Sequence, residues 1–378
     1  MLILMIVPSN GSKNEPSIFG KDQASALLKA GHQVVMLVCN LYSLRHKRQW
    51  GIFRLNSEPY PVWCCSFPLG AVPPVPLSLF FCSSHILLRF AMKRILKTCG
   101  RPDVLHAHFY TMGAIARFIK QDYGIPLVVT EHFSNINQDV LPTPVRRLAE
   151  QAYRAADKII SVSSGLRRRI AQHFSQDSVV IANIVDFPPM EEHSAEEKEG
   201  FVLVSAGHLL YGKGFDLLLK AFSAAGFDAS VRLKIMGAGA YEAELRKMAA
   251  DLHLEARVEL SGRPYKREDF FRVCRDADCF VLASRGETFG LVYVEAMAAG
   301  CPVIATDCGG PSDFVTAENG LLIPPENVED LMEALQQMRH TARTYDRAEI
   351  ARFVRARFSP EVVAAQITAV YEQAVARM

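Results

Sequence analysis

This 378-residue chain has no internal repeat, no low-complexity tract and no Cys-x-x-Cys pair. Only 22% of the residues are charged and 49% are hydrophobic, which excludes a collagenous or disordered chain. The nine cysteines are an odd number and include the adjacent Cys64 and Cys65, so we expect free thiols in a reducing compartment. A chain of this length is over twice the usual domain size, which predicts two domains.

The sequence also has no segment with the properties of a signal peptide or a membrane span. Its first run, MLILMIVP, is short, has no basic start and is followed by polar residues, so we interpret it as a first strand. The longest uncharged stretch, residues 59–88, is interrupted by six prolines. Its proline-free part is about 18 Å long as a helix, too short for a hydrocarbon core of roughly 30 Å. We therefore predict a cytoplasmic protein that is not integral to a membrane.

The net charge of +2 is unevenly distributed along the chain. Residues 1–195 carry 21 Lys and Arg against 13 Asp and Glu, a balance of +8, and the remainder carries 21 against 27, a balance of −6. The two halves therefore face different partners or each other. The basic runs at 45–48 and 167–169 contain no aromatic residues, so we do not expect a nucleic-acid partner.

Short apolar runs alternate with amphipathic stretches along the whole chain, which is typical of parallel strands joined by crossover helices. A proline-containing acidic segment at residues 186–200 separates two such sets as a linker. The predicted fold class is α/β, with two Rossmann-like doubly wound domains facing a central cleft, where ligands bind beyond the carboxyl ends of the strands. The predicted strands are residues 2–7, 33–38, 103–107, 126–130, 158–162, 201–207, 231–237, 256–262, 279–284, 301–306 and 320–324.

The segment with the most chemical information is residues 284–306, SRGETFGLVYVEAMAAGCPVIAT. Glu295 is the only charge in an apolar helix, so its carboxylate needs a partner. Glu287 lies eight residues earlier in a glycine-rich turn, and Gly290 opens the helix, whose first amides can bind an anion. Carboxylates suit paired hydroxyls and amides suit phosphates, which together favour a sugar nucleotide. An equally weighted alternative is that Glu295 bonds a neighbouring backbone group and Glu287 is an ordinary loop acid.

The spacing from Glu287 to Glu295, followed by AMAAGCPVIAT and Gly309-Gly310, resembles the EX7E signature of the retaining glycosyltransferases of family GT4, which have the GT-B fold. Further similar segments in the second half are GKGFDLLLKAF, IMGAGAYEAEL, VELSG, RDADCFVLAS and NGLLIPP. The first half is similar more loosely, through FGKDQASALLKAGHQV, PDVLHAH and VVTEH. The resemblance implies an acceptor-binding domain at residues 1–190, with a C-terminal helix at 358–378 packed on it, and a donor-binding domain at 198–350.

The resemblance also implies roles for individual residues. Glu287 and His108 would be the catalytic residues, beside the donor sugar and the anomeric carbon. In the donor site, Glu295 would hold the ribose hydroxyls and Lys213 the diphosphate. His208 stands where the family has an arginine, so one phosphate contact is weakened or is supplied by another cation. The remaining expected site residues are Phe289, Gly290 and Leu291 for donor sugar and phosphate, Arg285 for the missing phosphate contact, His132 in the cleft, and Ser17 with Gly11 or Gly20 in the loop after the first strand.

The implied function is retaining transfer of a sugar from a UDP- or GDP-sugar to a hydroxyl of a saccharide or lipid-linked saccharide, in the synthesis of a cell-surface polysaccharide or glycolipid. No cofactor or metal ion is expected, because Lys213 and helix amides balance the phosphate charge. The alternatives are a GT-B sugar-nucleotide epimerase, a non-catalytic sugar-nucleotide sensor, and a metal-dependent hydrolase using His106, His108 and His132. Residues 77–97 read either as a basic amphipathic helix on the inner, anionic face of a membrane or as a core helix with a solvated basic end.

Overall fold

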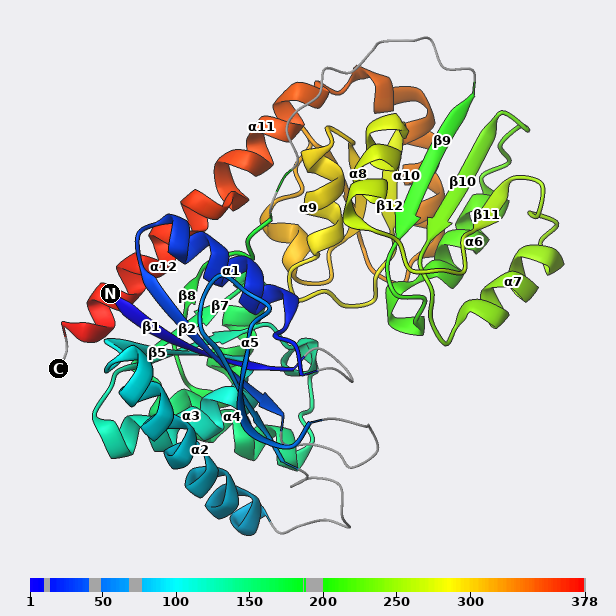
Figure 1. Ribbon diagram of the computed structural model, residues 1–378. Coiled ribbons are helices and arrows are strands. Elements are labelled where there is room, and N and C mark those ends of the chain that lie inside the picture. The colour runs from blue at the N-terminus through cyan, green and yellow to red at the C-terminus, as the bar shows by residue number, and fades with distance from the viewer. Residues whose placement is uncertain (10–13, 41–48, 68–76, 186, 188–199, 377–378) are drawn as a thin grey trace. The chain divides into compact units, whose positions relative to one another are not determined.

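The computed structural model describes residues 1–9, 14–40, 49–67, 77–185, 187 and 200–376, except for the side chains of residues 77–80 and 82. These residues form two compact units (Figure 1). Unit 1 consists of Met1–Ile184 together with Pro360–Met378, and unit 2 of Val185–Ser359. Within the described ranges, no helix combines the length and the apolar character that a membrane span requires.

Unit 1 is built on an eight-stranded sheet with the strand order β3-β4-β2-β1-β5-β6-β7-β8. Every neighbouring pair is parallel except β3 with β4. The central strands are nearly continuous apolar runs that are buried on both faces, as expected for a parallel sheet covered by helices on both sides. The strands are β1 (Leu2–Pro8), β2 (Gln33–Asn40), β3 (Gly51–Leu55), β4 (Val62–Ser66), β5 (Val104–His108), β6 (Leu127–Glu131), β7 (Lys158–Ser161) and β8 (Val179–Val180).

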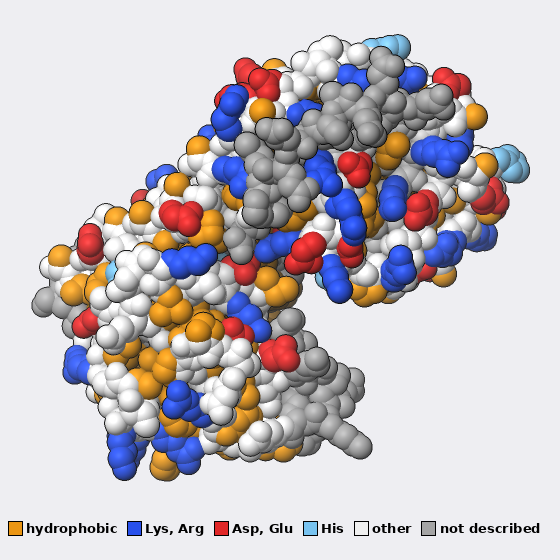
Figure 2. All heavy atoms as spheres, turned by 45° about the horizontal axis from the view of Figure 1, so that its top comes forward, with side chains coloured by type: hydrophobic (Ala, Val, Ile, Leu, Met, Phe, Trp, Pro, Cys, Tyr) orange, Lys and Arg blue, Asp and Glu red, His pale blue; other side chains and the backbone are white. Residues whose placement is uncertain are grey.

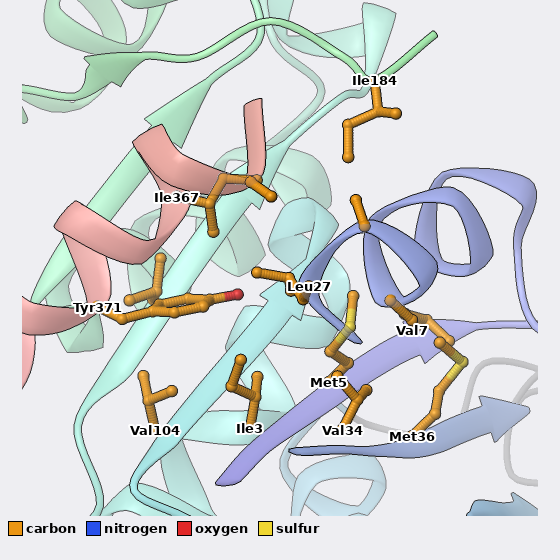
Figure 3. Packing of buried hydrophobic residues seen from close by; sticks show 14 of the residues in the cluster. Ile3, Met5, Val7, Leu27, Val34, Met36, Val104, Ile184, Ile367 and Tyr371 are labelled. Atoms are coloured by element: carbon orange, nitrogen blue, oxygen red, sulfur yellow. The ribbon is translucent and has the colours of Figure 1, made fainter. Parts of the chain in front are cut away.

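The last helix of the chain completes the core of unit 1. Ile367 and Tyr371 of this helix lie beside Leu27 and Ile3, and all four are 0% exposed (Figure 3). Hydrogen bonds add to this apolar contact, including one between His32 Nε2 and Thr368 Oγ1 at 2.9 Å. The helices of unit 1 are α1 (Ile18–Lys29), α2 (Leu77–Cys99), α3 (Phe109–Tyr123), α4 (Thr143–Ala155), α5 (Ser164–Phe174), α12 (Pro360–Val375) and the short η1 (Ser134–Asn137).

Unit 2 is built on a six-stranded sheet with the order β11-β10-β9-β12-β13-β14, and every neighbouring pair is parallel. Its strands are β9 (Phe201–Ala206), β10 (Val231–Met236), β11 (Val258–Leu260), β12 (Cys279–Leu282), β13 (Val303–Thr306) and β14 (Gly320–Ile323). Its helices are α6 (Phe215–Ala224), α7 (Glu242–Asp251), α8 (Arg267–Asp276), α9 (Leu291–Ala298), α10 (Val328–Thr341) and α11 (Arg347–Phe358), with short turns η2 (Tyr211–Lys213), η3 (Gly310–Asp313) and η4 (Ala342–Thr344).

The predicted fold class of two Rossmann-like α/β domains is confirmed. Each predicted strand is present, although β11 is confined to Val258–Leu260. The sequence did not predict β3, β4 or β8, and β4 comes from the proline-rich uncharged stretch. Unit 2 ends at Ser359 rather than at residue 350, and most of the predicted linker lies outside the described residues.

Candidate functional site

In unit 2, a buried ion pair joins the loops that follow β9 and β12. Glu287 is 7% exposed, and its Oε1 accepts hydrogen bonds from Lys213 Nζ at 2.6 Å and from Ser284 Oγ at 2.8 Å. Lys213 comes from the η2 turn, before α6 begins. A carboxylate this deeply buried requires a cationic partner, because desolvation of an unpaired charge is costly. The structure therefore brings together two of the residues that the sequence singled out.

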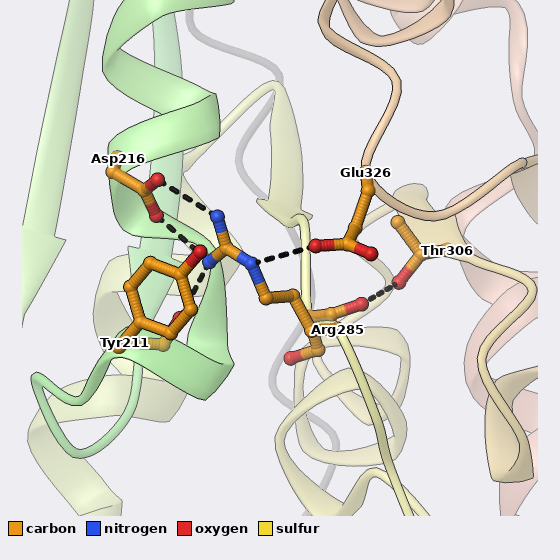
Figure 4. A network of polar contacts seen from close by, with 6 residues as sticks. Tyr211, Asp216, Arg285, Thr306 and Glu326 are labelled. Atoms are coloured by element: carbon orange, nitrogen blue, oxygen red, sulfur yellow. Dashed lines mark hydrogen bonds and ion pairs between the residues drawn. The ribbon is translucent and has the colours of Figure 1, made fainter.

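Arg285 is held by a polar network within unit 2 (Figure 4). Its two terminal nitrogens donate to Asp216 Oδ1 and Oδ2 at 2.9 and 2.8 Å, and its Nε lies 3.2 Å from Glu326 Oε1. Its guanidinium carbon lies 3.8 Å from the ring centroid of Tyr211. Burial by itself would raise the pKa of Asp216, but the hydrogen bond and charge of Arg285 lower it below the usual value. A phosphate on Arg285 would have to displace this bidentate carboxylate, so the arrangement does not favour the expected phosphate contact.

The same arginine fixes the turn that carries Lys213. Its terminal nitrogen donates to the carbonyl of Tyr211 at 2.6 Å, and its backbone N–H donates to the carbonyl of Gly212 at 2.9 Å. Gly214, which follows Lys213, has φ +67°, and a Cβ there would lie 1.8 Å from the carbonyl oxygen of Ala283. Only glycine allows the turn to approach β12 this closely. The position of Lys213 is therefore set by contacts with the segment that leads to Glu287.

Glu295 has the partner that its surroundings require. Its Oε1 accepts a hydrogen bond at 2.6 Å from Nε of Arg267, the first residue of α8. Sequence reasoning missed Arg267, because it precedes Glu295 by 28 residues and no local spacing relates the two. The ion pair orients the carboxylate at the position proposed for ribose binding.

Three of the other predicted donor-site residues, Phe289, Gly290 and Leu291, lie at the start of α9. Gly290 directly precedes this helix, which begins at Leu291 without a side-chain cap. Phe289 is buried against Phe314, with a ring-centroid distance of 5.6 Å. His208 is exposed in the loop after β9. The backbone N–H groups at the start of α9 and the ammonium group of Lys213 are thus suited to bind an anion at this site.

In unit 1, two of the predicted histidines meet at the carboxyl ends of adjacent strands. His108 ends β5, His132 follows β6, and His108 Nδ1 lies 3.1 Å from His132 Nε2. Burial lowers the pKa of His132 to about 4 and that of His108 well below its usual value, so both rings are neutral near pH 7. Among the described residues, Nε2 of His108 is buried and has no hydrogen-bond partner.

His106 does not join these two as a metal ligand. Its Nδ1 lies 2.6 Å from the hydroxyl of Tyr371, and its Nε2 lies 2.6 Å from Thr130 Oγ1, so both ring nitrogens are occupied. Burial also lowers the pKa of His106 to about 3. In the part of the chain that the structure describes, no group of three or more His, Cys, Asp or Glu side chains could hold a metal ion. The three-histidine metal site was therefore a wrong alternative.

Packing explains why a glycine stands at position 20, after the loop that follows β1. Ser17 occupies the N-cap position of α1 without a side-chain capping hydrogen bond, and a Cβ on Gly20 in the first turn would meet Val7 Cγ1 at 2.8 Å. Gly20 therefore permits α1 to pack on β1, and its presence does not require a ligand; Gly11 lies outside the described residues. The ring of Phe19 stacks on His132 at a centroid distance of 4.9 Å.

Solved structures with this architecture define its class. Sucrose-phosphate synthase from Thermosynechococcus elongatus superposes with a TM-score of 0.79 at 20% identity, over 100% of both chains. Anabaena HepE, solved in complex with UDP and glucose, has a TM-score of 0.71 at 19% identity, over 99% of this chain and 100% of its own. At these identities the likeness establishes the fold, which is GT-B.

Sequence comparison gives the family. Residues 186–351 match the model of the glycosyl transferases group 1, and residues 21–187 match that of glycosyltransferase family 4. D-inositol 3-phosphate glycosyltransferase from Pseudarthrobacter chlorophenolicus is 30% identical over 265 residues, which span 63% of this chain and 63% of that relative. The two models together span residues 21–351, and these matches support a GT4-like glycosyltransferase.

Proposed function

We propose that the protein is a retaining glycosyltransferase that uses a UDP- or GDP-sugar and a saccharide or lipid-linked saccharide acceptor, in the synthesis of a cell-surface polysaccharide or glycolipid. The observation that carries this proposal is the 2.6 Å contact between Lys213 and Glu287 beside the start of α9, together with Glu295, which lies in α9 and is held by Arg267 of α8. Lys213 and the helix amides match the diphosphate, Glu287 matches the donor sugar, and Glu295 matches the ribose. The UDP and glucose bound to the structurally similar HepE support a nucleotide-sugar donor.

The proposed reaction takes place on one face of the donor sugar. The acceptor oxygen bonds to the anomeric carbon, the bond from that carbon to the phosphate oxygen breaks, and the acceptor proton passes to the departing phosphate. Lys213 and the first amides of α9 stabilise the charge that grows on the diphosphate. Glu287 and the neutral His108 position the sugar and stabilise its developing charge. No step requires a metal ion, and that expectation remains a prediction.

A two-part experiment tests this function. UDP, GDP and ADP are first screened by thermal shift, where a diphosphate at 100 times its Kd should stabilise the protein by about 2.7 kcal/mol. The sugar nucleotides of the best diphosphate are then incubated with acceptors, and the new anomeric linkage is assigned by NMR. Stabilisation by no diphosphate, an inverted linkage, or release of an epimerised sugar nucleotide without acceptor would each overturn the proposal.

We also propose that α2 carries the enzyme to an anionic membrane surface. Leu88, Met92 and Ile95 bury one side of this helix in unit 1. On the other side, the large side chains Ile86 and Phe90 are 57% and 55% exposed. The exposed cations Arg89, Lys93 and Lys97 follow at helical spacing on the same face. An exposed face that is both apolar and basic, in the half of the chain with the positive balance, is the combination that an anionic bilayer attracts.

A further inference from the structure

The last residue of β6, Glu131, is a fully buried carboxylate that the proposed reaction does not use. It is 0% exposed and accepts four hydrogen bonds. Its Oε1 accepts from the backbone N–H groups of His132 and Phe133 at 2.9 and 2.8 Å. Its Oε2 accepts from the backbone N–H of Tyr110 at 2.8 Å and from the hydroxyl of Tyr153 at 2.7 Å. Four donors around one carboxylate satisfy a group that would otherwise be costly to bury.

These hydrogen bonds hold the backbone of the two segments that follow His108 and Glu131, and so restrain both histidines of the candidate site. His132 follows Glu131 in the sequence, and Tyr110 stands two residues after His108. Between them, Phe109 has φ 69°, a left-handed conformation that is unfavourable for a residue with a side chain and persists only where neighbouring contacts hold it. The ring of Phe109 lies 5.0 Å from that of His132. Glu131 thus holds a strained turn and the neighbouring loop in one arrangement.

The separation of His108 and His132 depends on that arrangement. A hydrogen bond between Nδ1 of His108 and Nε2 of His132 needs a proton on one nitrogen and a lone pair on the other. The pairing therefore links the tautomers of the two neutral rings, and it determines whether Nε2 of His108 donates or accepts a hydrogen bond. A shift of either loop would release both rings to mixed tautomers.

We propose that Glu131 is a positioning residue that fixes the geometry and tautomer of the His108–His132 pair by clamping the two loops that carry it. The consequence for turnover rests on the proposed function, in which His108 faces the reacting sugar. The consequence for the two rings does not depend on any substrate.

The test is the substitution Glu131→Gln, which keeps the size of the side chain but turns an NH₂ group toward two of the four donors. Long-range proton–nitrogen NMR of histidine-labelled protein should show His108 and His132 in one tautomeric state in the parent and in mixed or exchange-broadened states in the variant. With the identified donor and acceptor, kcat should fall about 10- to 100-fold through misplacement of the reacting groups. Nucleoside diphosphate affinity should not change, because that site lies in unit 2.

Asp157→Asn is the matched control, because Asp157, directly before β7, holds the other end of β6. Asp157 accepts a hydrogen bond from the backbone N–H of Leu127 at 2.8 Å and pairs with Lys120 at 2.7 Å. It should leave the histidine signals and kcat as in the parent. Tyr153→Phe removes one of the four hydrogen bonds, and it should give a weaker form of the same change even if Glu131→Gln does not fold.

Parent-like histidine signals in Glu131→Gln, or in Tyr153→Phe if only that variant folds, would overturn the inference, as would equal changes in Asp157→Asn. If the signals change as expected while the parent transfers no sugar, the positioning role stands and the proposed function fails.

Discussion

The two units present their candidate site residues in opposite electrostatic states. Unit 1 buries neutral histidines, whereas unit 2 sets its polar side chains in ion pairs such as Lys213 with Glu287 and Arg267 with Glu295. On the face drawn in Figure 2, charges of both signs are mixed over unit 2, while unit 1 shows a larger area of hydrophobic and uncharged side chains. Protonation destabilises a cluster of buried neutral histidines, whereas competing anions and salt weaken ion pairs. We therefore expect acid to affect unit 1 most and salt to affect unit 2 most.

The largest expected effect is the pH dependence of unit 1. The histidine pKa values lie below their usual value of 6.5, so their stabilisation is complete above pH 6.5 and is lost as the pH falls towards 4 and 3. Between pH 6.5 and 5, His106 and His132 each remove about 2 kcal/mol, and His108 acts in the same direction. Burial raises the pKa of Glu131 to about 7, so its contribution runs the other way: it is complete below about pH 4.5, is lost as the pH rises towards 7, and offsets one histidine.

Urea unfolding at pH 7 and pH 5 measures this difference. Both tryptophans of the chain, Trp50 and Trp63, belong to unit 1, so their fluorescence follows that unit. The free energy of unfolding should be on the order of 4 kcal/mol lower at pH 5. In His132→Asn the difference between the two pH values should be smaller, because one titrating group is gone. Equal stability at both pH values would contradict the neutral buried cluster.

The next largest effect concerns Lys213, the lysine proposed to bind the diphosphate. Lys213→Ala should weaken nucleoside diphosphate binding by about 10- to 100-fold, because a charge-assisted contact is lost. Calorimetry with the best diphosphate measures it, and Lys234→Ala is the control, since Lys234 pairs with Glu259 at 3.7 Å in the neighbouring strands. Unchanged affinity in Lys213→Ala would contradict the assignment of this lysine to the phosphates.

A smaller effect distinguishes two roles for Arg285. If Arg285 acts by holding the turn of Lys213, Arg285→Ala should weaken diphosphate binding by about 1 kcal/mol in the parent and by nothing further in Lys213→Ala. An independent phosphate ligand would give additive losses instead. The four affinities of this double-mutant cycle decide between the two, and additivity would restore the role that the sequence suggested for Arg285.

The exposed face of α2 gives an effect of similar or smaller size. Neutralising Arg89, Lys93 or Lys97 singly should weaken binding to anionic vesicles by about 1 kcal/mol each at low salt. Arg94→Gln is the control on the same helix, because Arg94 donates to the backbone carbonyl of Ile52. Sedimentation with anionic and neutral vesicles measures the bound fraction. Equal recovery in the supernatant with both kinds of vesicle would refute membrane docking through α2.

The smallest expected effect is that of a chelator. Because Lys213 and the amides of α9 balance the diphosphate charge in the proposed reaction, EDTA should leave transfer activity unchanged. Activity that EDTA abolishes and Mg²⁺ or Mn²⁺ restores would show that the cations of unit 2 do not suffice.

The sequence predicted what depends on local pattern. Parallel strands buried on both faces read as continuous apolar runs, and adjacent strand ends placed His108 and His132 in one region. It did not predict ion pairs between residues that are far apart in the sequence. One joins Arg267 to Glu295, and the other joins Arg285 to Asp216, which is 69 residues away and occupies the guanidinium of Arg285. Strand β4 was missed because prolines surround it, and proline normally argues against a strand inside a sheet.

The position of α12 has a consequence for how the chain is synthesised. Because α12 supplies part of the core of unit 1, that core remains incomplete on the ribosome until Ile367 and Tyr371 have emerged. Unit 2, a continuous segment, is translated in full before then and can fold first. The half that starts the chain is thus the last to finish. A nascent chain that stops at Ser359 would release a complete unit 2 beside an open core, which is the form that chaperones and proteases would meet.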